Sequence, residues 1–70
     1  MIEIDAILKD WSIQSNLPFR TGIVCIKGNV VTDHKNRFEQ DTTIITSPLV
    51  ELDLVNMIAR TKNSTYKLEI

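Results

Sequence analysis

The feature that most constrains this chain is the alternation of apolar and polar residues between position 22 and the C-terminus. Val, Ile and Thr are frequent there, and these β-branched residues are enriched in strands. A period of two places successive side chains on opposite faces of a strand. The pattern predicts strands at residues 22–32, 42–46, 49–53, 56–62 and 65–70.

Glycine, proline and asparagine mark the breaks between these predicted strands. Gly28 interrupts the first strand and indicates a bulge or a sharp bend. Pro48 cannot donate to a ladder, so residues 47–48 mark an edge, a bulge or a crossing between sheets. Asn63 and Ser64 predict a tight hairpin, because Asn tolerates the positive φ that such turns need.

The N-terminal segment has a different period. Its apolar residues recur at the i, i+3, i+4, i+7 spacing of a buried helical stripe: Ile4, Ile7, Leu8 and Trp11. We therefore predict a helix over residues 1–16, which Pro18 ends because the residue before a proline leaves helical geometry. The alternative is a short strand at residues 2–4.

One helix followed by about five short antiparallel strands predicts an α+β fold in a single domain of residues 1–70. We expect the strands to curl into a small SH3-like or OB-like partly open barrel, with the helix covering an open end or face. In the first strand, Val24, Ile26 and Val30 are expected to share one face. Trp11 and Phe38 are expected in the core.

A chain of 70 residues buries only about 60% of the surface that its unfolded form exposes, so it gains from a cross-link, a metal or a partner. Cys25 is the single cysteine, which excludes a disulfide within the chain. One cysteine and one histidine are also too few for a structural zinc site. We expect no metal or other cofactor, and we expect association with a protein partner or, as a homodimer, with a second copy.

The net charge of −1 argues against a dedicated nucleic-acid binder, which usually has a basic excess, and against a DNA mimic. The N-terminus lacks the basic start of a signal peptide, and no apolar run approaches the ~18 residues of a membrane span. A cytoplasmic protein without membrane contact is the expectation.

Residues 33–37, Asp-His-Lys-Asn-Arg, form a candidate anion- or partner-binding loop. His34, Lys35 and Arg37 supply donors that suit a phosphate. The competing interpretation is the tip of a hairpin, in which Asp33 and Asn36 bond to nearby backbone amides. We favour the hairpin tip, because acidic residues follow at once and offset the positive charge. If the loop does bind phosphate, an oligomeric sponge for nucleotide signals is the corresponding function.

Enzymatic activity is not expected. Cys25 and His34 are the one conceivable nucleophile–base pair, but Cys25 lies within an apolar strand, where free cysteine behaves as a small hydrophobe. The chain has no glycine-rich phosphate loop. We predict no catalytic residue.

Four cations on the predicted strands form an alternative binding face: Lys27, Arg60, Lys62 and Lys67. Small barrels bind single-stranded nucleic acid by stacking bases on aromatic residues within a basic groove. The competing interpretation is that strand lysines prevent pairing between sheet edges.

The favoured function is binding of another macromolecule without catalysis. An edge at Pro48 or at the terminal strand can accept a further strand. Ile23, Val31, Leu54 and Val55 are candidates for an exposed apolar patch, and such a patch usually marks an interface.

Four stretches carry a resemblance to a known group of proteins: GNV at 28–30, RF at 37–38, DTTIITSPLVELD at 41–53 and ARTKNSTYKL at 59–68. In these stretches the chain resembles small uncharacterised proteins of phages and prophages. Asp41-Thr42 departs from the Asp-Gly-Thr turn expected of that group. The resemblance implies a phage-encoded inhibitor of a host or defence protein.

Overall fold

The computed structural model describes residues 3–14 and 24–70, and every regular element in these residues is a strand. The strands are β1 (Ala6–Gln14), β2 (Cys25–Asp33), β3 (Thr43–Ile45), β4 (Leu49–Asp53), β5 (Ile58–Thr61) and β6 (Thr65–Leu68). The predicted α+β class is therefore wrong, because the segment expected to be a helix contains β1. The five strands predicted after residue 22 are confirmed as β2–β6, with β4 at the predicted bounds.

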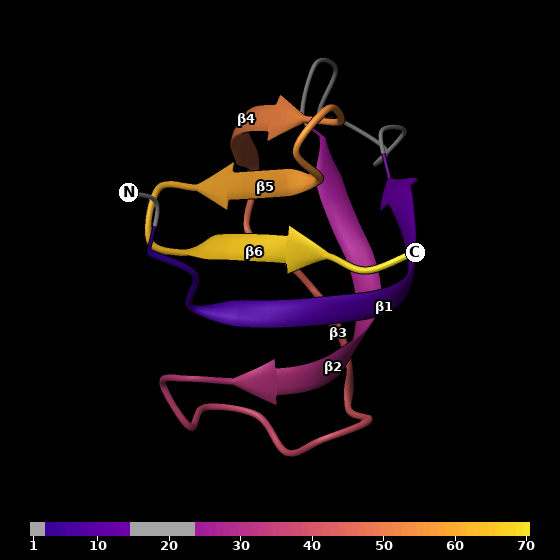
Figure 1. Cartoon of the computed structure of the whole chain (residues 1–70), viewed down its shortest axis with the longest axis vertical. Helices are drawn as coiled ribbons and strands as arrows, with labels where there is room; N and C mark the ends of the chain where they lie inside the picture. The colour runs from indigo at the N-terminus through magenta and orange to yellow at the C-terminus, as the bar shows by residue number, and fades with distance from the viewer. Residues whose placement is uncertain (1–2, 15–23) are drawn as a thin grey trace.

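All six strands form one sheet in the order β3-β2-β1-β6-β5-β4 (Figure 1). Neighbours pair antiparallel except β1 and β6, which run parallel with Ala6 beside Tyr66 and Leu8 beside Leu68. The sheet is therefore mixed, where the sequence predicted antiparallel pairing throughout. The terminal strand β6 lies inside the sheet.

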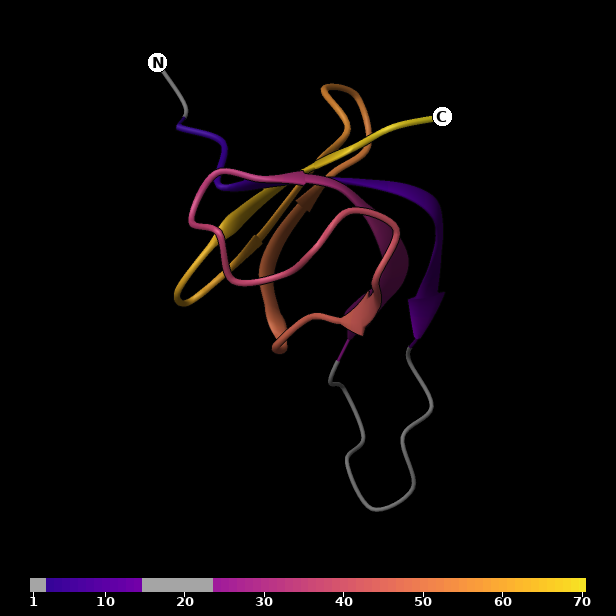
Figure 2. The ribbon, with the colours of Figure 1, turned by 90° about the horizontal axis from the view of Figure 1, so that it is seen from below.

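The sheet curls on itself without closing, as the view in Figure 2 shows. Its two edges, β3 and β4, follow one another in the chain. At the corner between them, the amide of Thr46 donates to Ile26 O and the amide of Leu49 donates to Val24 O, both at 2.8 Å. The position of Pro48 between two edge strands confirms one of the alternatives predicted for it.

A bulge in β1 explains the failed helix prediction. Lys9 pairs with Asn29 and Ser12 with Lys27, so two residues of β1 oppose the single residue Gly28. Asp10 takes up the extra length at φ 49°. The residues of β1 that contact the core are therefore Ala6, Leu8 and Trp11, and this change from even to odd positions imitates a helical period.

Gly28 lies opposite this bulge because the two backbones approach closely there. A Cβ atom on Gly28 would lie 3.1 Å from Trp11 Cβ and 3.3 Å from Leu8 Cβ. The bulge predicted near Gly28 is thus present, but the extra residue belongs to β1. A second register shift follows where β2 contributes the extra residue, Val31, between Ile7 and Leu8 of β1.

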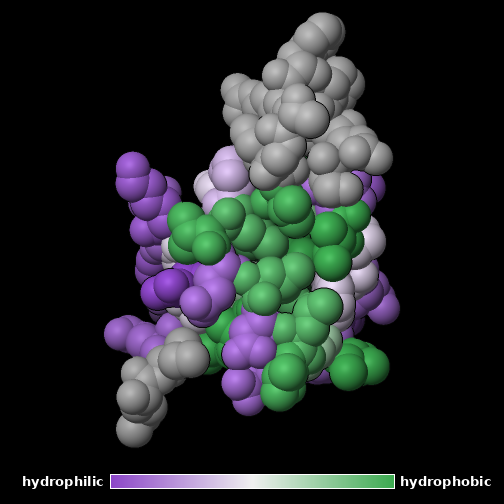
Figure 3. Space-filling model, turned by 90° about the horizontal axis from the view of Figure 1, so that it is seen from above, coloured by the Kyte–Doolittle hydropathy of each residue, from purple (hydrophilic) through white to green (hydrophobic). Residues whose placement is uncertain are grey.

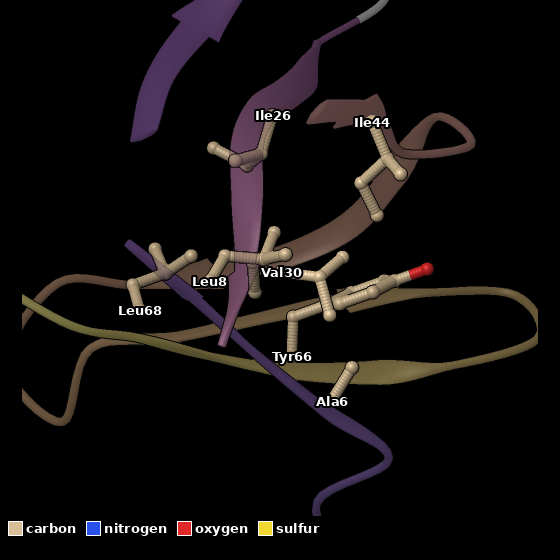
Figure 4. Close-up of a cluster of buried hydrophobic side chains, with 8 residues drawn as sticks. Ala6, Leu8, Ile26, Val30, Ile44, Tyr66 and Leu68 are labelled. Carbon is tan, nitrogen blue, oxygen red and sulfur yellow. The ribbon is translucent and has the colours of Figure 1, made fainter. Parts of the chain in front are cut away.

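The hydrophobic core fills the inside of the curled sheet (Figure 4). Its buried members are Ala6, Leu8, Ile26, Val30, Ile44, Ala59, Tyr66 and Leu68. Trp11 packs against this cluster from its side. Ile26 and Val30 share the core as predicted, whereas Val24 is half-buried. The expectation for Phe38 is wrong, since 36% of it is exposed and Tyr66 is the ring in the core.

The β5–β6 hairpin is held by a side chain rather than by positive φ at Asn63. The φ angle of Asn63 is not positive. Instead, the amide of Ser64 donates to Thr61 Oγ1 at 3.1 Å, and the amide of Thr61 donates to Ser64 O at 2.8 Å. The turn between β4 and β5 uses Met57 at φ 57°.

Candidate functional site

The loop after β2 is organised around the carboxylate of Asp33, whose side chain is 0% exposed. Three backbone amides donate to it: those of Lys35 at 3.0 Å, Arg37 at 2.6 Å and Phe38 at 3.0 Å. The prediction that Asp33 bonds to nearby amides is confirmed. Asn36 contributes differently, since it adopts φ 55° in this turn.

The same contacts set the ionisation of Asp33. Burial by itself would raise the pKa of this carboxyl, but the amide donors and the Arg37 guanidinium outweigh burial and hold the pKa below its ordinary value. Asp33 is therefore charged in the folded protein at neutral pH. This buried charge is fully hydrogen-bonded.

Arg37 joins the loop to the β5–β6 hairpin. Its Nε lies 3.3 Å and its Nη2 3.4 Å from the Asp33 carboxylate, and its Nη1 donates to Ser64 Oγ at 2.9 Å. The guanidinium also lies over the rings of Phe38 and Tyr66, 5.1 Å and 6.0 Å from their centroids. Burial by itself would lower the pKa of Arg37, but the interactions with Asp33 and Tyr66 together outweigh burial and the pKa is raised.

The other two predicted donors of this loop also make contacts within the chain. His34 Nδ1 lies 2.8 Å from the carbonyl of Ile4, so this nitrogen carries the proton of the bond. Lys35 Nζ donates to Asn63 O at 3.0 Å and lies 3.7 Å from Asp5 Oδ2. Asp5 in turn accepts the amide of Thr65 at 2.8 Å.

These contacts favour the hairpin-tip interpretation of residues 33–37 over the anion site. His34, Lys35 and Arg37 do lie in one loop, as predicted, but each donates to oxygen atoms of the same chain. A phosphate at this loop would have to compete with the Asp33 carboxylate for Arg37 and with Asp5 for Lys35. The geometry gives no support to a nucleotide sponge.

Cys25 and His34 lie beyond reach of one another. Cys25 begins β2 and His34 follows its last residue, so nine residue steps at ~3.3 Å each separate them along a strand. Cys25 is buried. Across the described residues, no three His, Cys, Asp or Glu side chains are grouped to hold a metal ion.

The four cations of the alternative basic face do not form a continuous stripe. Arg60 and Lys67 lie on the same face of β5 and β6, but Arg60 Nη2 lies 3.5 Å from Glu51 and Lys67 Nζ donates to Asn56 O at 2.9 Å. Lys62 is exposed in the β5–β6 turn. Lys27 lies on β2, which β1 separates from β6.

A hollow of about 590 Å³ lies on the outer face of β5 and β6. It is lined by Glu3, Asp5, Lys35, Glu51, Ile58, Arg60 and Thr65. Three carboxylates therefore meet two cations, which leaves one net negative charge. Of the four cations of the predicted basic face, Arg60 alone lines this hollow.

Exposed apolar side chains gather on β4 and the turn that follows it. Val50 is 63% exposed, Leu54 53% and Val55 91%. Leu52, between them, is half-buried and packs against the core. We call these four residues the β4 apolar surface, and Figure 3 shows apolar surface spreading over this end of the molecule.

The turn that carries Val55 is fixed by Asp53. One oxygen of its carboxylate accepts the amides of Val55 at 3.0 Å and Asn56 at 3.1 Å, and the other accepts Asn56 Nδ2 at 2.8 Å. The bond from the Asn56 side chain is the main cause that lowers the pKa of Asp53. The turn is thus hydrogen-bonded into one shape that presents an apolar side chain to water.

The predicted patch is confirmed in part. Leu54 and Val55 are exposed, Val31 is half-buried, and Ile23 lies outside the described residues. The terminal strand β6 cannot accept a further strand, because β1 and β5 occupy both its sides. The sequence interpretation missed Val50, whose exposure follows from the register shift between Leu49 and Glu51.

Comparison with known proteins identified no similar protein. Neither a protein-family model, nor a curated protein, nor a solved structure matches this chain. Within the described residues, no helix has the length and apolar character needed to cross a membrane.

Proposed function

We propose that this chain is a small non-enzymatic module that binds another protein through the β4 apolar surface. The observation that carries the proposal is Val55, an aliphatic residue 91% exposed on a turn that Asp53 holds in place. Exposed apolar groups on a preorganised turn favour binding, because little conformational freedom remains to be lost in the complex.

The polar end of the molecule supports the same proposal by contrast. Its donors already bond within the chain, so they stabilise the fold and are not free for a ligand. A phage-encoded inhibitor of a host or defence protein, as the sequence resemblance implies, is the specific form of this function that we propose.

Site-specific photocrosslinking tests the proposal. A benzophenone amino acid replaces Val55 in one variant and Ile45 in a matched control, since Ile45 is also aliphatic and 60% exposed but lies on the opposite edge strand, β3. We expect a discrete protein adduct in bacterial cells from the Val55 position and none from Ile45. Equal adducts at both positions, or none at either, would contradict the proposal.

A second variant separates the surface from the fold. Val55→Ser should suppress capture of the crosslinked partner while leaving the circular dichroism spectrum unchanged. Ile45→Ser should leave both unchanged. Retained capture by Val55→Ser would show that the β4 apolar surface is not the contact.

A further inference from the structure

Among the described residues, no strand pairs with the outer edge of β4, and this edge gives the β4 apolar surface a specific mode of binding. β4 ends the six-stranded sheet and pairs with β5 on one side only. On its other side, within the part of the chain that the structure describes, the amide of Leu49 bonds to Val24 O, and no backbone bond outside the β4–β5 ladder involves residues 50–53. An edge strand of this kind offers its outward N–H and C=O groups to another extended chain.

The side chains along this edge alternate in character. Glu51 and Asp53 pair with Arg60 and Ile58 on the outer face of the sheet, whereas Leu52 pairs with Ala59 and packs on the core. Leu54 follows and is exposed. A strand added here would place its own side chains alternately beside carboxylates and beside leucines.

The hollow on the outer face extends the acidic half of this pattern. Glu51 lines it together with Asp5 and Glu3, and its carboxylates exceed its cations by one. Arg60 lies 3.5 Å from Glu51 and Lys35 lies 3.7 Å from Asp5, so a long basic side chain beside Glu51 would share that carboxylate with Arg60 and face the one net negative charge of the hollow. Electrostatic complementarity of this type selects the partner more than it adds affinity.

We infer that β4 accepts an extended segment of the partner protein in which Lys or Arg alternates with aliphatic residues. This inference rests on the proposed function and assigns its partner chemistry. A second copy of the chain fits the edge poorly: antiparallel pairing of two β4 strands about Leu52 sets Glu51 opposite Asp53 of the other copy. Like charges directly opposite one another destabilise a strand pair.

A synthetic peptide, acetyl-Lys-Val-Lys-Val-Lys-Val-Lys-amide, tests the inference. With the isotope-labelled chain, we expect saturable shifts and slowed hydrogen exchange of the amides at residues 50–53. A peptide with the same side chains but N-methylated on alternate amides should bind about 10- to 100-fold more weakly, because it lacks two or so backbone hydrogen bonds worth ~1 kcal/mol each. Equal binding of both peptides would overturn strand addition.

Two matched variants test whether the carboxylate of Glu51 contributes to binding of the basic peptide. Glu51→Gln should weaken the unmethylated peptide about two- to fivefold, as expected for loss of one cross-strand charge pair. Glu39→Gln removes an exposed carboxylate from the loop between β2 and β3 and should leave the affinity unchanged. Equal effects of the two variants would overturn recognition at the β4 edge.

Two further outcomes separate this inference from the proposed function. If the peptide fails to bind while Val55 still crosslinks to a protein, the module binds its partner by another mode and the inference is wrong. A light-scattering mass of twice the monomer, lost in Val50→Lys, would also overturn it by showing that a second copy occupies the edge. If the peptide binds but no protein crosslinks to the chain at position 55, the proposed function is wrong instead.

Discussion

The two ends of this small sheet handle their exposed groups in opposite ways. In the loop after β2, Asp33 and Arg37 lie at the centre of a closed set of hydrogen bonds. On β4 and its turn, hydrogen bonds that the Asp53 carboxylate accepts instead fix a turn whose apolar side chains are exposed to water. The loop after β2 looks most like a binding site in the sequence, but its polar groups stabilise the fold. The turn after β4 looks ordinary in the sequence, but it is the better contact surface.

The largest effect should follow from removing the buried carboxylate. Asp33→Ala leaves three backbone amides and a partly buried guanidinium without their acceptor, which should destabilise the fold by about 3–5 kcal/mol. Urea unfolding followed by circular dichroism measures this. A loss below about 1 kcal/mol would remove the distinction between the two ends.

Acid should weaken the same end. The pKa of Asp33 is lowered in the folded state, because its amide and guanidinium donors outweigh the effect of burial. Its charge therefore contributes stability above the unfolded pKa, near 3.8, and that contribution is lost as the pH falls through the lower, folded value.

The urea concentration at the unfolding midpoint, measured from pH 6 downward, should decrease once the pH is below about 4. Asp53 contributes in the same direction, since its pKa is also lowered, chiefly by the Asn56 side chain. Asp33→Asn, which cannot ionise, should show a flatter acid limb than the wild type. An unchanged acid limb in that variant would place the sensitive group elsewhere.

Arg37→Ala is the intermediate case. It removes the bonds to Asp33 and to Ser64 but leaves the three amide donors in place. We expect a loss of about 1–2 kcal/mol in the free energy of unfolding. Addition of phosphate should not stabilise the wild type relative to this variant; a phosphate-dependent rise in melting temperature that needs Arg37 would restore the anion-site interpretation.

The smallest effect on stability is expected at the apolar end. Val55 is almost fully exposed, so Val55→Ser should change the free energy of unfolding by no more than about 0.5 kcal/mol. The same urea titration checks this. A loss comparable with that of Arg37→Ala would mean that Val55 packs within the fold.

The strands after residue 24 could be predicted because β-branched residues are frequent in them and turn-forming residues separate them, even though β2 and β4 each contain a register shift. β1 could not be, because the bulge at Asp10 shifts its inward side from even to odd positions. No local signal distinguishes that shift from a helical period. Only pairing with β2 and β6 decides it, and these partners are distant in sequence.

In the candidate sites too, contacts between residues near in sequence could be predicted and contacts across the fold could not. Asp33 bonds to amides two to five residues away, and a turn-forming aspartate predicts contacts of that kind. The contacts that occupy Arg37 and Lys35 lie across the fold, at Ser64 and Asn63, and nothing near the loop indicates them. The exposure of Val50 likewise depends on the register of β4 against β5.

The most direct test of the account measures both ends in the same two assays. Arg37→Ala and Val55→Ser are compared for unfolding free energy and for capture of the partner identified by crosslinking, at a temperature where both variants are folded. We expect Arg37→Ala to lose stability and keep its partner, and Val55→Ser to keep its stability and lose its partner. The opposite assignment, with folded Arg37→Ala unable to capture the partner and Val55→Ser unaffected, would contradict the account.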